Sequence, residues 1–109
     1  MLIARALVRT PKLLTLDEPC TGLDIAGRET FLNLLTQMIE MKQGPTIIFA
    51  THRIEEIVKA FTHVIMVRDG RIVCAGTKDS ILTSRNMTDA FGVNVRVVKH
   101  KGRYNAFCL

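Results

Sequence analysis

Two short apolar runs of the chain each end in side chains that could do chemistry. Residues 13–16 are followed by the adjacent acids Asp17 and Glu18, and the run 46–51 is followed by His52. In open α/β sheets, ligands bind in the crevice outside the carboxyl ends of the strands. Acids after an apolar strand are also common as solvated strand ends. If both runs are parallel strands, however, these side chains share one edge of a sheet, where a ligand would bind.

The first run has the pattern of a buried parallel strand. Residues 13–16 are almost continuously apolar, which suits a strand covered on both faces. Pro19 cannot donate to a strand ladder and therefore ends the run. Gly22 permits a tight turn, and Asp24 is a good N-cap for the helix that follows.

An amphipathic helix is predicted between the two strands. Its apolar residues recur at helical spacing: Phe31, Leu32, Leu35, Met38 and Ile39. Gly44 and Pro45 end it. A strand, a crossover helix and a second strand form a βαβ unit, in which the two strands are parallel. This arrangement places Asp17, Glu18 and His52 at the same edge of the sheet.

Further helices are predicted on both sides of this unit. A short amphipathic helix is expected over residues 2–10 and a second helix over residues 53–60. Thr77 is expected to cap a third short helix. A further helical turn over residues 88–91 should close at Gly92.

Two hairpins are predicted in the second half of the chain. Asp69-Gly70 lies between two β-rich runs within residues 63–76, and this dipeptide is a strong signal for a two-residue turn. In the tail, alternating valines precede Lys101-Gly102 and a second run follows. The tail therefore predicts a small terminal hairpin.

Length and composition are those of one small cytoplasmic domain. The chain has 109 residues, of which 48% are hydrophobic, and no apolar run approaches the roughly 20 residues that span a bilayer. Arginines interrupt the first apolar segment, so a secretory signal peptide is not expected. The three cysteines have no C-x-x-C spacing, which argues against a disulfide framework and a zinc site. They are expected to be reduced and mostly buried.

The positive charge does not predict a nucleic-acid partner. The formal net charge is +5, but the basic residues are scattered and only residues 99–103 form a local cluster. Aromatic residues make up 6% of the chain and are not interleaved with the basic ones, so no stacking platform for single strands is present. A solvated basic turn is the favoured interpretation.

Three segments together resemble the ABC-type ATPases. Residues 13–18 resemble the Walker B strand of that family, and Thr21-Gly22-Leu23-Asp24 resembles its D-loop. His52 resembles its switch histidine. The three occur in the family's order and spacing, and the resemblance covers nearly the whole chain. It implies an α/β fold, namely a partial P-loop NTPase domain over residues 1–109. Parallel strands with a crossover helix would be followed by a carboxyl-terminal β-hairpin and short helices.

The resemblance also implies roles for individual residues. Asp17 would be the carboxylate on the magnesium side, and Glu18 would be the general base that orients the attacking water. His52 would be catalytic and would contact the γ-phosphate of ATP. Asp24, as the D-loop acid, would take part in binding the nucleotide. The implied cofactors of the intact domain are ATP and Mg²⁺.

The parts of the family pattern that hold the phosphates are absent from the sequence. None of the seven glycines begins Gly-Lys-Ser or Gly-Lys-Thr, and no Leu-Ser-Gly-Gly-Gln signature is present. The chain thus resembles the carboxyl-terminal half of the domain, and Met1 resembles an internal boundary. Phosphoryl transfer depends on positioning and electrostatic stabilisation. The isolated fragment is therefore expected neither to bind ATP tightly nor to hydrolyse it.

The family's organisation implies the partners and the location. A second ATPase subunit or domain would complete a dimer, and a transmembrane transporter subunit would hold the protein at the inner face of the cell membrane. In the family's sheet, the strand leading into the phosphate loop lies between the strand ending at His52 and the strand at residues 64–67. Without that strand two edges are unpaired. The fragment is therefore expected to self-associate, to rearrange or to need its missing half.

Three functions remain open at the level of sequence. The first is an ABC transporter ATPase subunit that couples ATP hydrolysis to solute movement. The second is a soluble ABC-type ATPase of DNA repair or chromosome organisation, and the third is a non-catalytic interaction fragment. The hairpin and short helix within residues 69–82 resemble those of transporter ATPases and favour the first. The absent phosphate loop supports the third.

Overall fold

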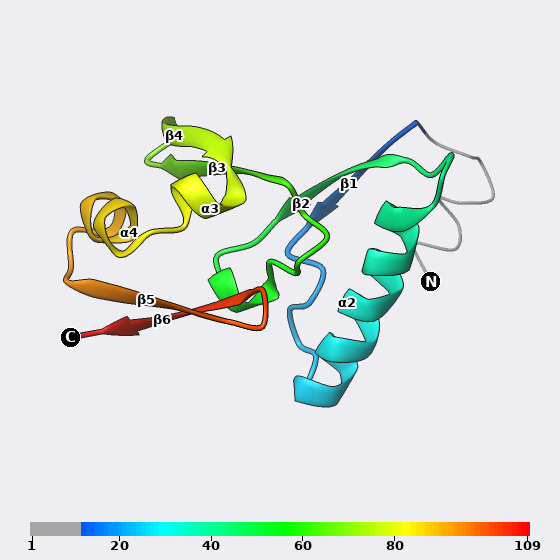
Figure 1. Ribbon diagram of the computed structural model, residues 1–109, viewed down its shortest axis with the longest axis horizontal. Helices are drawn as coiled ribbons and strands as arrows, with labels where there is room; N and C mark the ends of the chain where they lie inside the picture. Colours follow the sequence, from blue (N-terminus) through cyan, green and yellow to red (C-terminus); the bar gives the residue numbers. More distant parts are fainter. Residues whose placement is uncertain (1–11) are drawn as a thin grey trace. The chain divides into compact units, whose positions relative to one another are not determined.

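The computed structural model describes residues 12–109, which divide into two compact units, the first ending at His52 and the second covering Arg53–Leu109. The helix predicted over residues 2–10 lies outside the described residues. Within the described part of the chain, no helix has the length and apolar character needed to cross a bilayer. The elements combine α and β structure, as the sequence predicts (Figure 1).

The first unit contains a parallel pair of strands joined by a helix. The elements are β1 (Leu13–Asp17), α2 (Ile25–Glu40) and β2 (Thr46–Ala50). The pairing runs in register from Leu13 opposite Thr46 to Asp17 opposite Ala50. Both strands therefore end at the same edge, and the predicted βαβ unit is confirmed.

Helix α2 begins as its sequence predicts, and it ends at Glu40, before the predicted stop at Gly44 and Pro45. The Asp24 carboxylate accepts a hydrogen bond of 2.7 Å from the Gly27 backbone N–H, which satisfies one of the donors exposed at a helix N-terminus. After the helix, a Cβ on Gly44 would come within 2.6 Å of the Met38 carbonyl oxygen, so only glycine fits this turn. The helix buries four residues along one face: Phe31, Leu32, Leu35 and Met38.

The prediction of strands covered on both faces is wrong for the described residues. In β1, Leu14 and Leu16 are buried, whereas Leu13 is 54% exposed. In β2, Ile48 is 50% exposed. Successive side chains of a strand point to opposite faces. The described residues cover only one of these faces, and the apolar side chains of the other face are left exposed.

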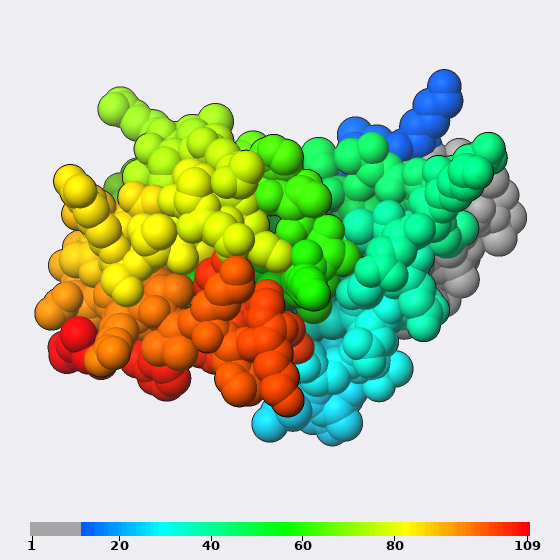
Figure 2. All heavy atoms as spheres, in the orientation of Figure 1, coloured from blue at the N-terminus to red at the C-terminus, as the bar shows by residue number. Residues whose placement is uncertain are grey.

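The second unit is built from two antiparallel hairpins and short helical segments. Its elements are η1 (Ile54–Glu56), β3 (His63–Arg68), β4 (Arg71–Thr77), α3 (Lys78–Ile81), α4 (Ser84–Phe91), β5 (Val95–His100) and β6 (Arg103–Cys108). They share one core, which consists of Ile54, Met66, Ile81, Leu82, Met87, Ala90, Val95 and Tyr104. In Figure 2 the terminal hairpin, in orange and red, lies against the yellow segment that holds α3 and α4.

Both predicted hairpins are present and have similar turns. Strand β3 pairs with β4 around Asp69 and Gly70, whose φ angles are 51° and 74°. Strand β5 pairs with β6 around Lys101 and Gly102, whose φ angles are 50° and 78°. Positive φ at both central residues is the mark of a type I′ turn, which matches the twist of the flanking strands.

The prediction of a helix over residues 53–60 is wrong. The segment forms a single 3₁₀ turn, η1, and Ile57 after it has extended backbone. In an α-helix the Glu55 carbonyl would accept from the backbone four residues later. Here it accepts a hydrogen bond from the Arg103 guanidinium of β6. Packing against the terminal hairpin therefore replaces the second turn of the helix.

Helix α4 is longer than the predicted turn over residues 88–91. It begins at Ser84, because the Thr83 hydroxyl caps it by accepting a 3.2 Å hydrogen bond from the Asn86 backbone N–H. It ends as predicted at Gly92, which has a φ of 69°. Two hydroxyl groups of α4 accept hydrogen bonds from backbone N–H groups of β5. Ser84 accepts from the Val97 N–H at 2.8 Å, and Thr88 accepts from the Val95 N–H at 3.0 Å.

The prediction of mostly buried cysteines is also wrong. Cys20 is buried, Cys74 is half-buried and Cys108 is exposed. Both of the latter lie on hairpin strands, where alternation sends every second side chain outward. Within residues 12–109, none of the three cysteines forms a disulfide.

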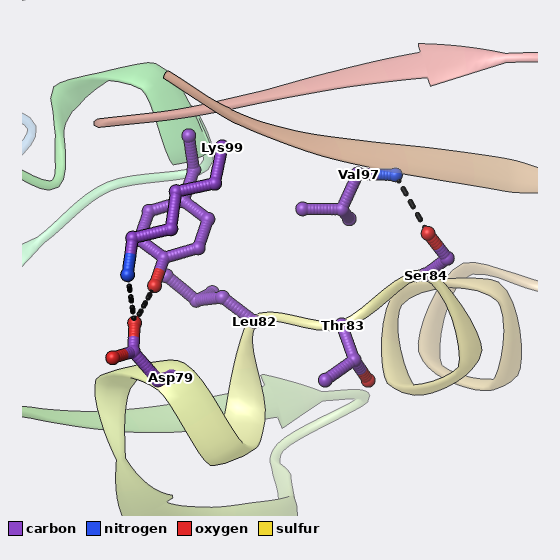
Figure 3. A pocket seen from close by; sticks show the side chains of 7 residues that line it. Asp79, Leu82, Thr83, Ser84, Val97 and Lys99 are labelled. Atoms are coloured by element: carbon purple, nitrogen blue, oxygen red, sulfur yellow. Dashed lines mark hydrogen bonds and ion pairs between the residues drawn. The ribbon is translucent and has the colours of Figure 1, made fainter. Parts of the chain in front are cut away.

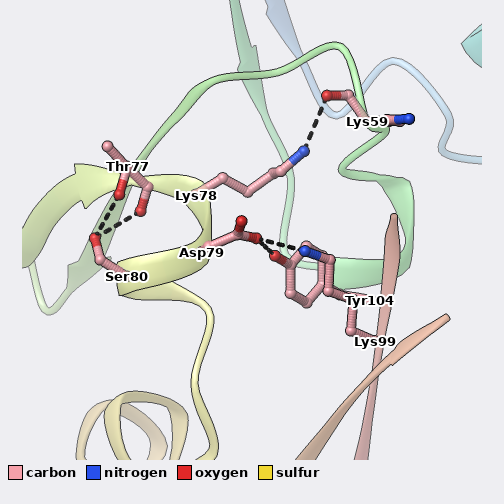
Figure 4. Close-up of polar contacts among 7 residues, drawn as sticks. All are labelled: Lys59, Thr77, Lys78, Asp79, Ser80, Lys99 and Tyr104. Carbon is pink, nitrogen blue, oxygen red and sulfur yellow. Dashed lines mark hydrogen bonds and ion pairs between the residues drawn. The ribbon is translucent and has the colours of Figure 1, made fainter. Parts of the chain in front are cut away.

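A polar cluster ties α3 to the terminal hairpin (Figure 4). One oxygen of Asp79 accepts hydrogen bonds from the Tyr104 hydroxyl and, at 3.0 Å, from the Lys99 ammonium. These two hydrogen bonds, of which the one from Tyr104 has the larger effect, hold the pKa of Asp79 below its ordinary value of 3.8. Burial, and then the hydrogen bond to Asp79, raises the pKa of Tyr104 above its ordinary value of 10.0.

Asp79 is expected to make the stability of the second unit depend on acid pH. Because the pKa of Asp79 is lower in the folded chain than in the unfolded chain, its stabilisation is complete above pH values near 3.8 and is lost as pH falls through the folded pKa. We therefore measure urea unfolding over the range in which Asp79 takes up its proton, from about pH 6 to about pH 2.5. Over this range, the free energy of unfolding should fall less in Asp79→Asn than in the wild type. Tyr104→Phe should move the wild-type loss to higher pH. An unchanged profile in both variants would contradict this expectation.

Candidate functional site

The ends of β1 and β2 bring together two of the side chains singled out by the sequence. Asp17 and Ala50, the last residues of the two strands, are paired. The next backbone N–H, that of Glu18, donates to the Ala50 carbonyl oxygen at 2.9 Å. Beyond this last ladder bond, the Glu18 Oε1 and His52 Nδ1 atoms lie 2.8 Å apart. An acid and a histidine distant in sequence thus form a direct pair at one rim.

The geometry of this pair defines what each group can still do. An ionised carboxylate only accepts hydrogen bonds, so a proton on His52 Nδ1 makes the contact with Glu18. The second imidazole nitrogen and the second carboxylate oxygen then remain for a ligand or water. The His52 side chain is 69% exposed and that of Glu18 is 36% exposed. The pair is therefore accessible from solvent and can exchange protons with a bound molecule.

Asp17 lies at the same strand end and is exposed. Within residues 12–109, no group of three or more His, Cys, Asp or Glu side chains forms a metal cage. Magnesium is commonly held by one or two carboxylates together with waters and substrate phosphates. A single carboxylate at a strand end fits that mode of binding, although it does not fit a site made by protein alone.

The structure places Asp24 at the N-terminus of α2. Its Oδ1 atom accepts the hydrogen bond from Gly27 described above, which confirms the predicted N-cap. A carboxylate has a second oxygen, so capping through Oδ1 does not prevent Asp24 from accepting a further hydrogen bond through its other oxygen. A role of Asp24 in binding ATP stays a prediction.

Two features of the site were not found from the sequence. One is the Ala50 carbonyl, which fixes the backbone of Glu18. The other is the backbone conformation of Glu18, whose φ of 48° is in the left-handed region. No sequence signal marks either feature, because a carbonyl is common to all residues and glutamate is not a residue that favours positive φ.

The second unit has a pocket of about 370 Å³ that contains none of these residues (Figure 3). It is lined by Asp79, Leu82, Thr83, Ser84, Val97, Lys99 and Tyr104. Its charged pair is engaged internally, since Asp79 accepts from Lys99, and Ser84 accepts from the Val97 backbone. The polar groups of this pocket thus serve to hold the terminal hairpin, and the rim of β1 and β2 is the stronger candidate site.

Comparison with known proteins identifies relatives that match nearly the whole chain. No family model matches the sequence. The chain is 36% identical over 95% of its length to the uncharacterized ABC transporter ATP-binding protein YmeB of Lactococcus lactis subsp. lactis (strain IL1403), and covers 40% of that protein. It is 35% identical over 94% of its length to the uncharacterized ABC transporter ATP-binding protein YlmA of Bacillus subtilis (strain 168), and covers 39% of it.

A solved structure agrees with these relatives. The chain matches, with a TM-score of 0.79 and 27% identity, a chain of a structure described as an inward-facing conformation of an ABC transporter assigned to the metal-chelate type. The match covers 99% of this chain and 43% of the other. The chain thus spans about two fifths of the length of the proteins that it matches. Over nearly all of its own length, it corresponds to part of an ABC transporter ATP-binding protein.

Proposed function

We propose that this chain supplies the water-activating part of an ATPase site in an ABC transporter ATP-binding protein. The observation that carries the proposal is the 2.8 Å contact between Glu18 and His52 at the ends of two parallel strands. The ABC transporter ATP-binding relatives support the choice of ATP as the nucleotide. The phosphate loop that would hold the nucleotide is not in this sequence.

In this mechanism, Glu18 orients the attacking water and accepts its proton. A positioned general base of this kind accelerates a reaction by about 10²–10⁴-fold. His52 holds the Glu18 carboxylate through Nδ1, and its other ring nitrogen would contact the terminal phosphate of the nucleotide. Asp17 would hold Mg²⁺, which when bound neutralises charge on the phosphates. Asp24 would contribute to nucleotide binding from the start of α2.

The relatives also support a set of partners. We propose a second ATPase subunit or domain, which would complete a dimer, and a transmembrane transporter subunit to which the protein is bound on the cytoplasmic side. Residues 1–109 would form one partial domain of the complete protein. Self-association of the isolated chain also stays a prediction. It is favoured by the exposed apolar residues of the β3–β4 hairpin, of which Ile65, Val67 and Ile72 are each more than 60% exposed.

The isolated chain is expected to show no ATP turnover, because its acids have no bound phosphate to act on. The test is a nucleotide titration and a phosphate-release assay on the 109-residue chain, alone and together with an amino-terminal half that carries a phosphate loop. Turnover should require both parts. Turnover by the chain alone, abolished by Glu18→Gln, would refute the prediction. Saturable nucleotide binding without turnover by the combined parts would favour the non-catalytic alternative.

A further inference from the structure

A regular continuation of the two strands would keep Glu18 and His52 apart. Strands β1 and β2 are parallel and in register, with Asp17 opposite Ala50. If both strands continued, Glu18 would lie opposite Thr51, and His52 would lie one residue further along. Successive side chains of a strand alternate between faces. Glu18 would then point to the face that holds the buried Leu16, and His52 would point to the opposite, exposed face.

The backbone at Glu18 breaks this alternation. Its φ is 48°, although glutamate has a Cβ that disfavours the left-handed region. The following residue is Pro19, and a residue before proline prefers extended backbone. Glu18 therefore departs from two local preferences at once.

Three contacts keep Glu18 in this conformation. Its N–H donates to the Ala50 carbonyl at 2.9 Å, and its own carbonyl accepts from the Thr21 N–H at 3.3 Å. Its side chain accepts from His52 at 2.8 Å. The first two contacts involve only the backbone, so they can hold the conformation even when the side chain is changed.

We propose that the left-handed backbone of Glu18 is a positioning element, which turns the carboxylate out of the strand's alternation and onto His52. The effect of this conformation on catalysis rests on the proposed function, whereas the conformation itself and the contact with His52 do not. Strained backbone is retained in proteins where the surroundings over-determine it, and such residues gather at functional sites. The unfavourable backbone conformation of Glu18 thus lowers local stability, but it brings the carboxylate into contact with His52.

The proposal is tested by comparing Glu18→Gly with Glu18→Ala in the full chain. Both variants lose the carboxylate and its contact with His52, so their difference isolates the backbone. At a left-handed position glycine is favoured over alanine, and the unfolding equilibrium constant of Glu18→Gly should be about 5-fold smaller than that of Glu18→Ala. At an extended position the order is reversed. Urea unfolding, or thermal melting under one fixed condition, shows which of the two variants is more stable.

Thr15 provides the matched control. It is an exposed residue of β1 with regular strand pairing opposite Ile48. There, Thr15→Gly should have an unfolding equilibrium constant about 2- to 5-fold larger than that of Thr15→Ala. The proposal is overturned if Gly is the less stable variant at both positions.

A spectroscopic measurement checks the positioning itself. In ¹⁵N-labelled wild-type chain, the intraresidue NOE between the amide proton and Hα of Glu18 should be as strong as positive φ requires, and the His52 Nδ1 resonance should respond to Glu18→Gln. Thr15→Ala should leave that resonance unchanged. A negative φ at Glu18, or a His52 resonance insensitive to Glu18→Gln, would overturn the proposal. These readouts do not involve ATP, so they can succeed even if the proposed ATPase function is wrong.

Discussion

Replacing Glu18 by Gln in the complete ATP-binding protein is expected to lower kcat for ATP hydrolysis by about 10²–10⁴-fold, the usual contribution of a general base. Gln has nearly the shape of Glu and can still contact His52, which lies 2.8 Å from the Glu18 carboxylate in the wild type. It cannot accept the proton of the attacking water. The change therefore removes proton transfer and leaves the site otherwise intact.

The measurement is steady-state phosphate release at saturating ATP, with nucleotide affinity determined separately by titration. Affinity should change little, because the proposed role of Glu18 concerns water rather than the nucleotide. Glu40→Gln is the matched control, since Glu40 is an exposed glutamate at the last turn of α2 and lies away from the rim. If Glu18→Gln reduces kcat no more than Glu40→Gln does, Glu18 is not the general base.

Replacing Leu35 by Ala is expected to lower the free energy of unfolding of the first unit by about 2–5 kcal/mol. Leu35 has no exposed surface and is one of the three largest fully buried side chains of the described residues, together with Leu32 and Met38. Shortening it loses the transfer free energy of the removed methyl groups and leaves a cavity. A loss of this size is a large part of the stability of an ordinary domain.

The adjacent residue of α2 gives the control for this change. Leu34→Ala is the same substitution in the same helix, but Leu34 is 36% exposed. It should lower the free energy of unfolding by less than about 1 kcal/mol, because less apolar surface is removed from a buried environment. Urea unfolding monitored by circular dichroism compares the two. Equal losses in both variants would show that α2 does not pack through the Leu35 face.

Local sequence patterns were sufficient to predict the structure where the residues of the pattern and the element that they define lie a few positions apart. Asp69-Gly70 predicts the β3–β4 hairpin because the turn itself needs positive φ, which these residues tolerate. Asp24 predicts the start of α2 because its side chain can reach the Gly27 N–H without help from the rest of the fold. The common edge of β1 and β2 follows from the short βαβ connection.

Predictions failed where a distant part of the chain competes with the local pattern. The apolar spacing of residues 53–60 favours an α-helix, but Arg103 takes the Glu55 carbonyl and the helix ends after one 3₁₀ turn. The sequence of α3 likewise gives no indication that Asp79 will accept from both Tyr104 and Lys99. Such side-chain contacts join residues 20 or more positions apart, and a local window does not contain both partners.

The sequence by itself determined the α/β class, the two parallel strands within residues 13–17 and 46–51, and the residue types available at their rim. Only the tertiary structure decided that Glu18 meets His52. Strand alternation alone predicts opposite faces for these two side chains, and a left-handed residue held by the Ala50 carbonyl reverses that outcome. The conformation is unfavourable for glutamate in isolation, so contacts with the neighbouring strand must stabilise it, and those contacts exist only in the folded chain.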